Sequence, residues 1–184
     1  MIGLRLARPE DASALAEVNV SAWRQAYADR VPALMTDLVT VERRGALWQA
    51  LLTEHAAQFQ ALVAVDEGND RPVGFILVGP AINAVGGGED PGDEVEAEIH
   101  LLAVDPAYQR RDLGRRLFYA MAERLVAEGR MRAITTFLDN PEARAFYRAV
   151  GGVEGSAVPV PGVPLSQYLF AWPDLSRLPA QPGS

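Results

Sequence analysis

The segment that decides the fold is Val104-Asp-Pro-Ala-Tyr-Gln-Arg-Arg-Asp-Leu-Gly-Arg-Arg-Leu-Phe118. An apolar run, Ile99 to Val104, ends at Asp105-Pro106, and a basic turn with one glycine leads into a helix predicted over roughly 109–128. The apolar residues of that helix recur every four positions and form one stripe: Leu113, Leu117, Met121 and Leu125. A strand, a turn and a helix in this order can hold an anion, because the first turn of a helix has unpaired backbone N–H groups and the positive end of the helix dipole.

The charged side chains around this turn leave two interpretations open. Four arginines add positive charge beside the helix start: Arg110, Arg111, Arg115 and Arg116. They favour an anion site, and the alternative is a solvated helix start with Asp112 as its N-cap. Asp112 is also a carboxylate at the place where a phosphate would approach, and it would compete for the same N–H groups.

The composition indicates a soluble globular protein, because 49% of its 184 residues are hydrophobic and 22% are charged. This length fits one domain, which we expect over 1–176, followed by a loose tail over 177–184. Without cysteine and with two histidines, neither a disulfide nor a metal site is expected. The formal net charge of −7 argues against nucleic-acid binding. The sequence has no secretory signal and no apolar run of ~20 residues, so we expect a cytoplasmic protein without a membrane partner.

The pattern of apolar residues predicts helices and strands mixed along the whole chain. Strands are predicted at 4–7, 60–65, 73–78, 95–104, 132–138 and 166–172. Helices are predicted at 8–26, 41–54, 109–128 and 140–150. For the second helix, Thr40 is the expected N-cap, and the expected apolar face comprises Leu47, Trp48, Leu51 and Leu52. An irregular link is expected at Val31-Pro32 and a flexible loop at 83–93. This order indicates an α/β or α+β fold with one central sheet.

Two further groups have side chains suited to acid–base chemistry. Glu98 and His100 are two residues apart, so they share one face of a strand that is otherwise apolar. They fit a proton-transfer site, and the alternative is the wet face of an edge or half-exposed strand. Tyr147 follows Asn140 on the short fourth helix. It is either a proton donor or a core residue whose hydroxyl group is satisfied.

Taken together, these groups resemble one known family. The succession Glu98-Ile-His-Leu-Leu-Ala-Val-Asp-Pro-Ala-Tyr-Gln-Arg-Arg-Asp-Leu-Gly114, then Asn140, then Ala145-Phe-Tyr-Arg-Ala-Val-Gly151, resembles the GNAT superfamily of acetyl-CoA-dependent N-acetyltransferases. The segments 4–11 and 21–27 are similar to its first strand and helix, so the resemblance covers nearly the whole chain. It implies a GNAT-like acyl-CoA N-acyltransferase fold, an α/β fold whose central mixed sheet is splayed between strands 4 and 5, with acetyl-pantetheine in the gap.

The resemblance also implies a role for each matched residue. Acetyl-CoA would be the cosubstrate, without a metal. Its pantetheine arm would lie along Leu102, Ala103 and Val104, and Asn140 would meet the same arm. The pyrophosphate would be held by the turn Gln109, Arg110, Arg111, Asp112, Leu113, Gly114 and Arg115. Glu98 would act as the general base, and Tyr147 would give a proton to the departing thiolate. The acceptor would bind near Trp23, Tyr27, His100 and the segment 31–38.

The implied function is N-acetyltransfer from acetyl-CoA to a primary amine of a small molecule, an aminoacyl group or a peptide, and a homodimer is left open. One departure gives an alternative. The family turn reads Gln/Arg-x-x-Gly-x-Gly/Ala, and Asp112 replaces its first glycine. A carboxylate beside a phosphate is repelled by ~1 to several kcal/mol. The alternative is therefore a catalytically impaired GNAT-fold module that binds acyl-CoA or has a regulatory role. A lesser alternative is an enzyme that transfers an acyl group other than acetyl.

Overall fold

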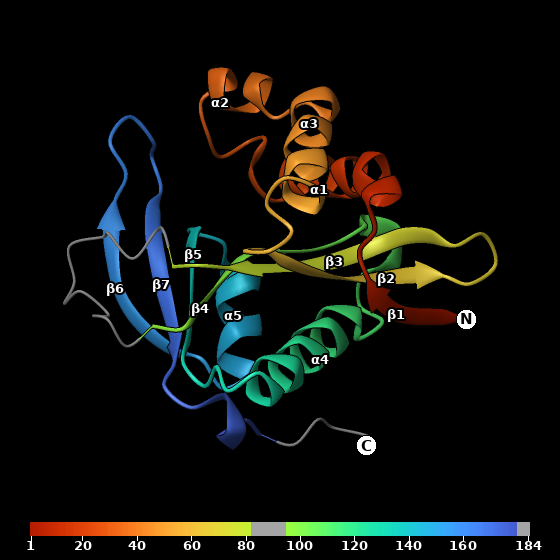
Figure 1. Cartoon of the computed structure of the whole chain (residues 1–184). Helices are drawn as coiled ribbons and strands as arrows, with labels where there is room; N and C mark the ends of the chain where they lie inside the picture. The colour runs from red at the N-terminus through yellow and green to blue at the C-terminus, as the bar shows by residue number, and fades with distance from the viewer. Residues whose placement is uncertain (82–94, 180–184) are drawn as a thin grey trace. The chain divides into compact units, whose positions relative to one another are not determined.

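The computed structural model describes residues 1–81 and 95–179, so the loop predicted at 83–93 and residues 180–184 of the predicted tail lie outside the described residues. The strands are β1 (Ile2–Leu6), β2 (Gln60–Asp66), β3 (Arg71–Gly79), β4 (Ala97–Val104), β5 (Ala133–Leu138), β6 (Val153–Pro159) and β7 (Ser166–Trp172). The helices are α1 (Ala12–Tyr27), α2 (Ala33–Leu38), α3 (Val41–Leu52), α4 (Leu113–Ala127) and α5 (Pro141–Ala149) (Figure 1). All predicted strands and helices are present, and α2 and β6 were not predicted.

The strands form one mixed sheet of seven in the order β1-β2-β3-β4-β5-β7-β6. β4 and β5 pair in parallel, whereas β1–β2, β2–β3, β5–β7 and β6–β7 pair antiparallel. The parallel ladder joins Ala97–Ile99 to Ala133–Thr135, although β4 runs on to Val104 and β5 to Leu138. The mixed α/β fold is therefore confirmed, and the β4–β5 ladder is short, as a splay between these strands requires.

The chain divides into two compact units, and both β4 and α4 contribute residues to each. The first unit comprises Met1–Val78 and Leu101–Leu117, and the second comprises Gly79–His100 and Phe118–Ser184. The single domain expected over 1–176 stays a prediction.

In the first unit, α1 and α3 pack on one face of β2 and β3 (Figure 1). The Trp48 ring meets the Phe75 ring edge-on at 4.7 Å between centroids. The predicted N-cap of α3 is confirmed, because Thr40 Oγ1 accepts a hydrogen bond from the Arg43 N–H at 3.2 Å. The predicted apolar face is wrong at Leu47, which is 40% exposed. α2 was missed because it is short and buries none of its residues.

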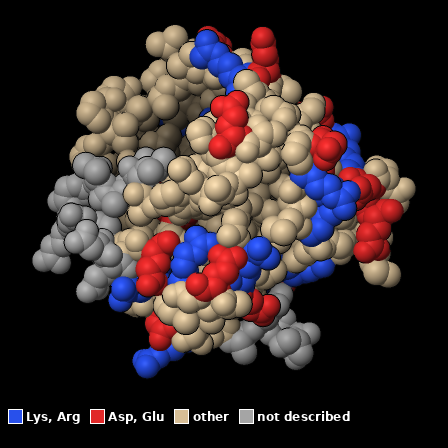
Figure 2. Space-filling view, viewed as in Figure 1, with Lys and Arg blue, Asp and Glu red and all other residues tan. Residues whose placement is uncertain are grey.

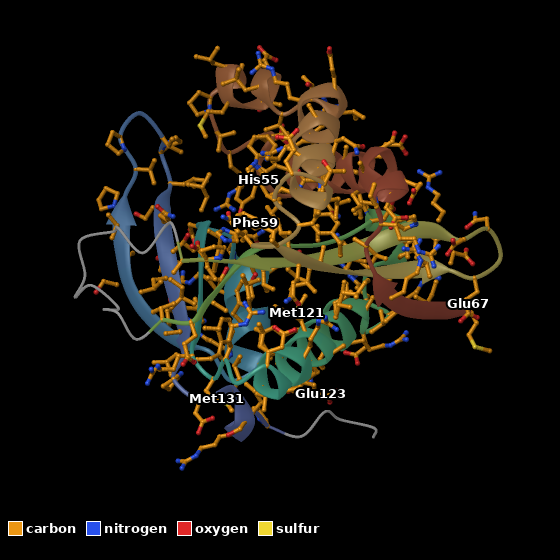
Figure 3. The ribbon with its side chains drawn as sticks, in the orientation of Figure 1. His55, Phe59, Glu67, Met121, Glu123 and Met131 are labelled. Atoms are coloured by element: carbon orange, nitrogen blue, oxygen red, sulfur yellow. The ribbon has the colours of Figure 1, made fainter. Side chains whose placement is uncertain are left out.

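The apolar stripe predicted for α4 is confirmed, since all four of its residues are buried. Met121 lies on the buried side of the helix, and Glu123 lies on the opposite, exposed side (Figure 3). None of the helices in the described ranges has the length and apolar character needed to cross a membrane. On the face seen in Figure 2, acidic and basic side chains lie intermixed.

In the second unit, α5 packs against β5 and β7 through its aromatic residues. The close approach depends on Gly152, where an added Cβ atom would lie 2.9 Å from both the Tyr147 carbonyl oxygen and the Trp172 ring. β6 is the last strand in the sheet order, and most of its residues are exposed. Because an exposed edge strand needs no alternating apolar pattern, its sequence gave no strand signal.

One ion pair fastens the start of α1 to β1. Arg5 donates to both carboxylate oxygens of Asp11, at 2.7 and 2.9 Å, and Asp11 is 6% exposed. Burial alone would raise the pKa of Asp11, but the hydrogen bonds from Arg5 and from the Arg8 N–H, together with the charge of Arg5, hold that pKa below its ordinary value.

Replacing Arg5 by methionine should therefore lower the free energy of unfolding by about 2–3 kcal/mol, because a buried carboxylate loses its partner. The pair stabilises fully above the pKa of an unfolded aspartate, about 4, and its contribution is lost as the pH falls through the lower folded-state pKa. Urea unfolding between pH 7 and 2.5 measures both effects. The control is Arg71→Gln, which breaks the exposed pair with Glu17 and should change stability by less than about 0.5 kcal/mol. Equal losses in both variants would contradict this account.

Candidate functional site

In the first unit, a turn of unusual backbone geometry connects β4 to α4. α4 begins at Leu113, later than the predicted start at Gln109, because residues 109–112 belong to the turn. Arg110 and Asp112 both have positive φ angles, +59° and +60°. This left-handed region suits glycine, is tolerated by aspartate and is unfavourable for arginine. The positive φ angle at position 112 therefore favours glycine there.

The Asp112 side chain does not occupy the N–H groups that open α4. Its carbonyl oxygen accepts from the Arg116 N–H at 3.0 Å, so the residue stands at the helix N-cap position. Its carboxylate instead lies 3.3 Å from Arg115 Nε and is half exposed. Within the described part of the chain, the amides of Leu113, Gly114 and Arg115 donate no hydrogen bond. The predicted competition for these N–H groups is not seen in this structure.

Side chains on both sides fasten the turn. Gln109 Nε2 donates to the Val104 carbonyl oxygen at 3.1 Å and to Gln25 Oε1 of α1 at 2.8 Å. The Tyr108 hydroxyl donates to Asp66 of β2 at 3.3 Å. The Gln109 side chain is occupied by these supporting contacts. Its expected contact with the pyrophosphate would therefore be made by its backbone N–H group.

The four arginines of the turn differ in what they contact. Arg116 donates to the Ile2 carbonyl oxygen at 2.9 Å, which ties it to β1. Arg111 stacks over the Tyr108 ring, 5.2 Å from its centroid. Arg110 is exposed and, among the described residues, forms no ion pair. Two of them, Arg110 and Arg111, are thus on the surface and at the turn.

The end of β4 and the helix α1 complete this half of the site. Leu102, Ala103 and Val104 are half-buried. Gly74 of β3 lies so near that its added Cβ atom would be 3.1 Å from the Ala103 carbonyl oxygen. Trp23 and Tyr27 are both half-buried, and their ring centroids are 5.6 Å apart.

In the second unit, Glu98 is a buried carboxylate. It is 1% exposed, and Thr136 Oγ1 of β5 donates to its Oε1 atom at 3.5 Å. The alternative of a wet edge strand is wrong, because β4 lies between β3 and β5. A buried carboxylate in a central strand is costly unless neighbouring groups compensate it.

His100 lies beside Glu98 with both ring nitrogens engaged. Nε2 is 2.9 Å from the Pro80 carbonyl oxygen, which can only accept, so Nε2 carries a proton. Nδ1 then faces Glu98 Oε1 at 3.8 Å.

Asn140 and Tyr147 lie at the start and in the middle of α5. Asn140 Oδ1 caps the helix by accepting from the Glu142 and Ala143 N–H groups at 3.0 and 3.3 Å. Tyr147 is 6% exposed, and four aromatic rings surround it at 5.1 to 5.8 Å between centroids: Phe137, Phe146, Phe170 and Trp172. The ring is therefore held rigidly in place.

The structure brings the predicted residues together in two groups. One unit holds the turn 109–115, the residues 102–104 and the Trp23–Tyr27 pair; the other holds Glu98, His100, Asn140 and Tyr147. The sequence analysis missed supporting residues that contact these groups: Gln25, Asp66, Pro80 and Thr136. A local pattern does not reveal them, because each is distant in sequence from the residue it supports. Over the described ranges, no group of acidic or histidine side chains is arranged to hold a metal ion.

Residues 20–151 match the model of the acetyltransferase (GNAT) family. The chain belongs to this family.

Three relatives illustrate the likeness. A stretch of 56 residues is 43% identical to the N-alpha-acetyltransferase RimI of Mycobacterium tuberculosis, covering 30% of this chain and 34% of that protein. The uncharacterised N-acetyltransferase YuaI of Bacillus subtilis is 26% identical over 180 residues, 97% of this chain and 96% of that protein. Among solved structures, the PaiA N-acetyltransferase of Thermoplasma acidophilum in complex with coenzyme A superposes with a TM-score of 0.70 at 16% identity, covering 94% and 98% of the two chains. At that identity the likeness shows the fold.

The left-handed conformation of Arg110 predicts that glycine substitutions at the two neighbouring arginines change stability in opposite directions. Arg110→Gly should raise the free energy of unfolding by about 0.5–1 kcal/mol, because relief of a left-handed arginine outweighs the added freedom of the unfolded chain. Arg111→Gly should lower it by about 1 kcal/mol, since its φ is ordinary and its contact with the Tyr108 ring is lost. Thermal unfolding at neutral pH measures both variants. A loss of stability in Arg110→Gly equal to that in Arg111→Gly would contradict the strain.

Proposed function

We propose that this protein transfers an acetyl group from acetyl-CoA to a primary amine of a small molecule, an aminoacyl group or a peptide. One observation carries the proposal: the open amides of Leu113, Gly114 and Arg115, beside the surface arginines Arg110 and Arg111. Unpaired N–H groups at a helix start and guanidinium groups suit a phosphate, so these residues fit the pyrophosphate of coenzyme A. When bound, acetyl-CoA supplies an activated thioester carbonyl group.

We assign the binding of the pantetheine arm to backbone groups of residues 102–104 and to the Asn140 side-chain amide. Asn140 uses its Oδ1 atom as a helix cap, so its Nδ2 group is the part left to donate. The Leu102 N–H is the proposed donor to the negative charge that develops on the thioester oxygen. Positioning of the amine beside the thioester would supply most of the rate.

Glu98 is the proposed general base. A free alkylammonium group has a pKa of about 10, so the amine must lose a proton before it attacks. Two observations support this role: Glu98 is buried, and His100 Nδ1 lies 3.8 Å from its Oε1 atom. His100 would then assist the base in addition to, or in place of, contacting the acceptor.

Tyr147 is the proposed acid for the departing thiolate. Its aromatic cage holds the phenol in one orientation, as a proton donor requires. The acceptor is proposed to bind near Trp23, Tyr27 and the segment 31–38. A cytoplasmic location, one domain over 1–176 and a homodimer remain part of the proposal.

The second candidate function is that of a catalytically impaired module, which binds acyl-CoA without transferring the acyl group. This candidate is considered because Asp112 replaces the first glycine of the family turn. Its ion pair with Arg115 argues against this candidate, because the charge of the carboxylate is partly neutralised and, in the described part of the chain, the carboxylate accepts no hydrogen bond from the amides at the start of α4. The same binding experiment tests both candidates.

Acetyl-CoA should bind the wild type in the micromolar range, as measured by calorimetry. Asp112→Asn removes the charge and keeps a residue that tolerates positive φ, so it should tighten binding by about threefold to tenfold. Asp112→Gly should tighten it at least as much. Glu123→Gln, a charge removal on the exposed side of α4, is the matched control and should leave affinity unchanged. Binding by Asp112→Gly alone, with none by the wild type, would favour the impaired module. Tighter binding of another acyl-CoA would redefine the donor.

Glu98→Gln and Tyr147→Phe should each lower kcat by about 10²-fold or more with any accepted amine, because each loses a proton-transfer group. Their affinity for acetyl-CoA should stay within about twofold of wild type. The control is Tyr119→Phe, which removes a buried hydroxyl without a hydrogen-bond partner among the described residues. All 17 basic side chains are arginines, so no lysine of the enzyme adds acetylated background to the assay. Unchanged kcat in both variants would remove the acid–base assignment.

A further inference from the structure

Two neighbouring threonines of β5 lie beside the proposed base. Thr135 is 2% exposed, and its Oγ1 atom donates to the Ile99 carbonyl oxygen of β4 at 2.8 Å. Thr136 donates from its Oγ1 atom to Glu98 Oε1 at 3.5 Å. All four of these residues belong to the second unit. One hydroxyl group therefore reaches the backbone directly after Glu98, and the other reaches the Glu98 carboxylate.

The register of the parallel ladder explains why the two hydroxyl groups have different partners. Ile99 pairs with Thr135, and Glu98 pairs with Ile134. Side chains alternate between the two faces of a strand, so Thr136 lies on the same face of the sheet as Glu98. Thr135 lies on the opposite face, together with Ile99. The two threonines thus hold β4 from opposite faces of the sheet.

The hydrogen bond from Thr135 lies at the end of the ladder. Ile99 and Thr135 are its last pair, although β4 continues to Val104 and β5 to Leu138. Glu98 is thus one residue away from the point at which the two strands stop pairing. Backbone at the end of a ladder opens more readily than backbone in its interior. The buried Thr135 hydroxyl adds a bond at this point, and the branched side chain has few rotamers to lose.

We propose that Thr135 and Thr136 are positioning residues that hold Glu98 in place for proton transfer. This inference rests on the proposed acetyl transfer with Glu98 as its base. Thr135 fixes the backbone that carries the glutamate, and Thr136 fixes the direction of its carboxylate. The proton moves from the amine to Glu98, and both threonines keep theirs. Because a base must lie within hydrogen-bond reach of the proton that it takes, a small displacement of the carboxylate lowers the rate.

The test removes each hydroxyl group in turn. Thr135→Val and Thr136→Val keep the branched shape, and each should lower kcat by about threefold to tenfold, the effect of one lost hydrogen bond. The Kd for acetyl-CoA should stay within about twofold of wild type. Serine at either position keeps the hydroxyl group and should restore most of the lost kcat. The matched control is Thr53→Val, which removes a hydroxyl bond of 2.7 Å to the Gln49 carbonyl oxygen at the end of α3 and should leave kcat unchanged.

A double-mutant cycle separates positioning of the base from a general structural effect. In a Glu98→Gln background, the two valine substitutions should change kcat by less than about twofold, because the group that they position is gone. If a valine variant does not fold, alanine at the same position repeats the measurement.

Three outcomes would overturn the inference, and they differ in what else they remove. Equal losses of kcat with and without Glu98 would make the threonines structural. Wild-type kcat in both valine variants, with Glu98→Gln impaired, would overturn the inference while acetyl transfer stands. Unchanged kcat in Glu98→Gln, or no acetylation of any amine, would remove the proposed base together with the inference.

Discussion

The proposed cofactor site depends on the amides at the start of α4, which have no partner within the helix, and on the turn of two left-handed residues that precedes them. Arg110 and Asp112 adopt these conformations, and the Asp112 carboxylate pairs with Arg115. The geometry persists because Gln109 fastens the turn to α1 and to the end of β4. Backbone strain of this kind costs about 1–3 kcal/mol per residue and is retained mainly at functional sites. The proposed cofactor site thus depends on support that lies outside the turn itself.

The proposed chemistry depends on a separate set of constraints in the second unit. Glu98 is compensated by Thr136 and by His100, whose orientation is set in turn by the Pro80 carbonyl oxygen. Tyr147 is held by aromatic rings, and Gly152 permits that packing. The buried carboxylate, the neighbouring imidazole and the caged phenol are the groups that the proposed proton transfers would use.

Much of the fold could be predicted from periodic patterns. The α4 stripe, the Thr40 cap and the strand order along the chain follow from local rules that the packing reinforces. The rest depends on tertiary context. β6 is an exposed edge, α2 buries nothing, and Leu47 falls just off the buried face of α3. The positive φ of Asp112 and the burial of Glu98 could not be read from residue type, because each is decided by segments distant in sequence.

The most direct test of the central claim is backbone NMR of the protein titrated with coenzyme A and, separately, with pantetheine, which lacks the pyrophosphate. The account predicts that the N–H signals of Leu113, Gly114 and Arg115 shift strongly with coenzyme A and much less with pantetheine. The signals of residues 102–104 should respond to both. If coenzyme A binds and leaves the signals of the α4 start unchanged, the pyrophosphate lies elsewhere and the account is contradicted.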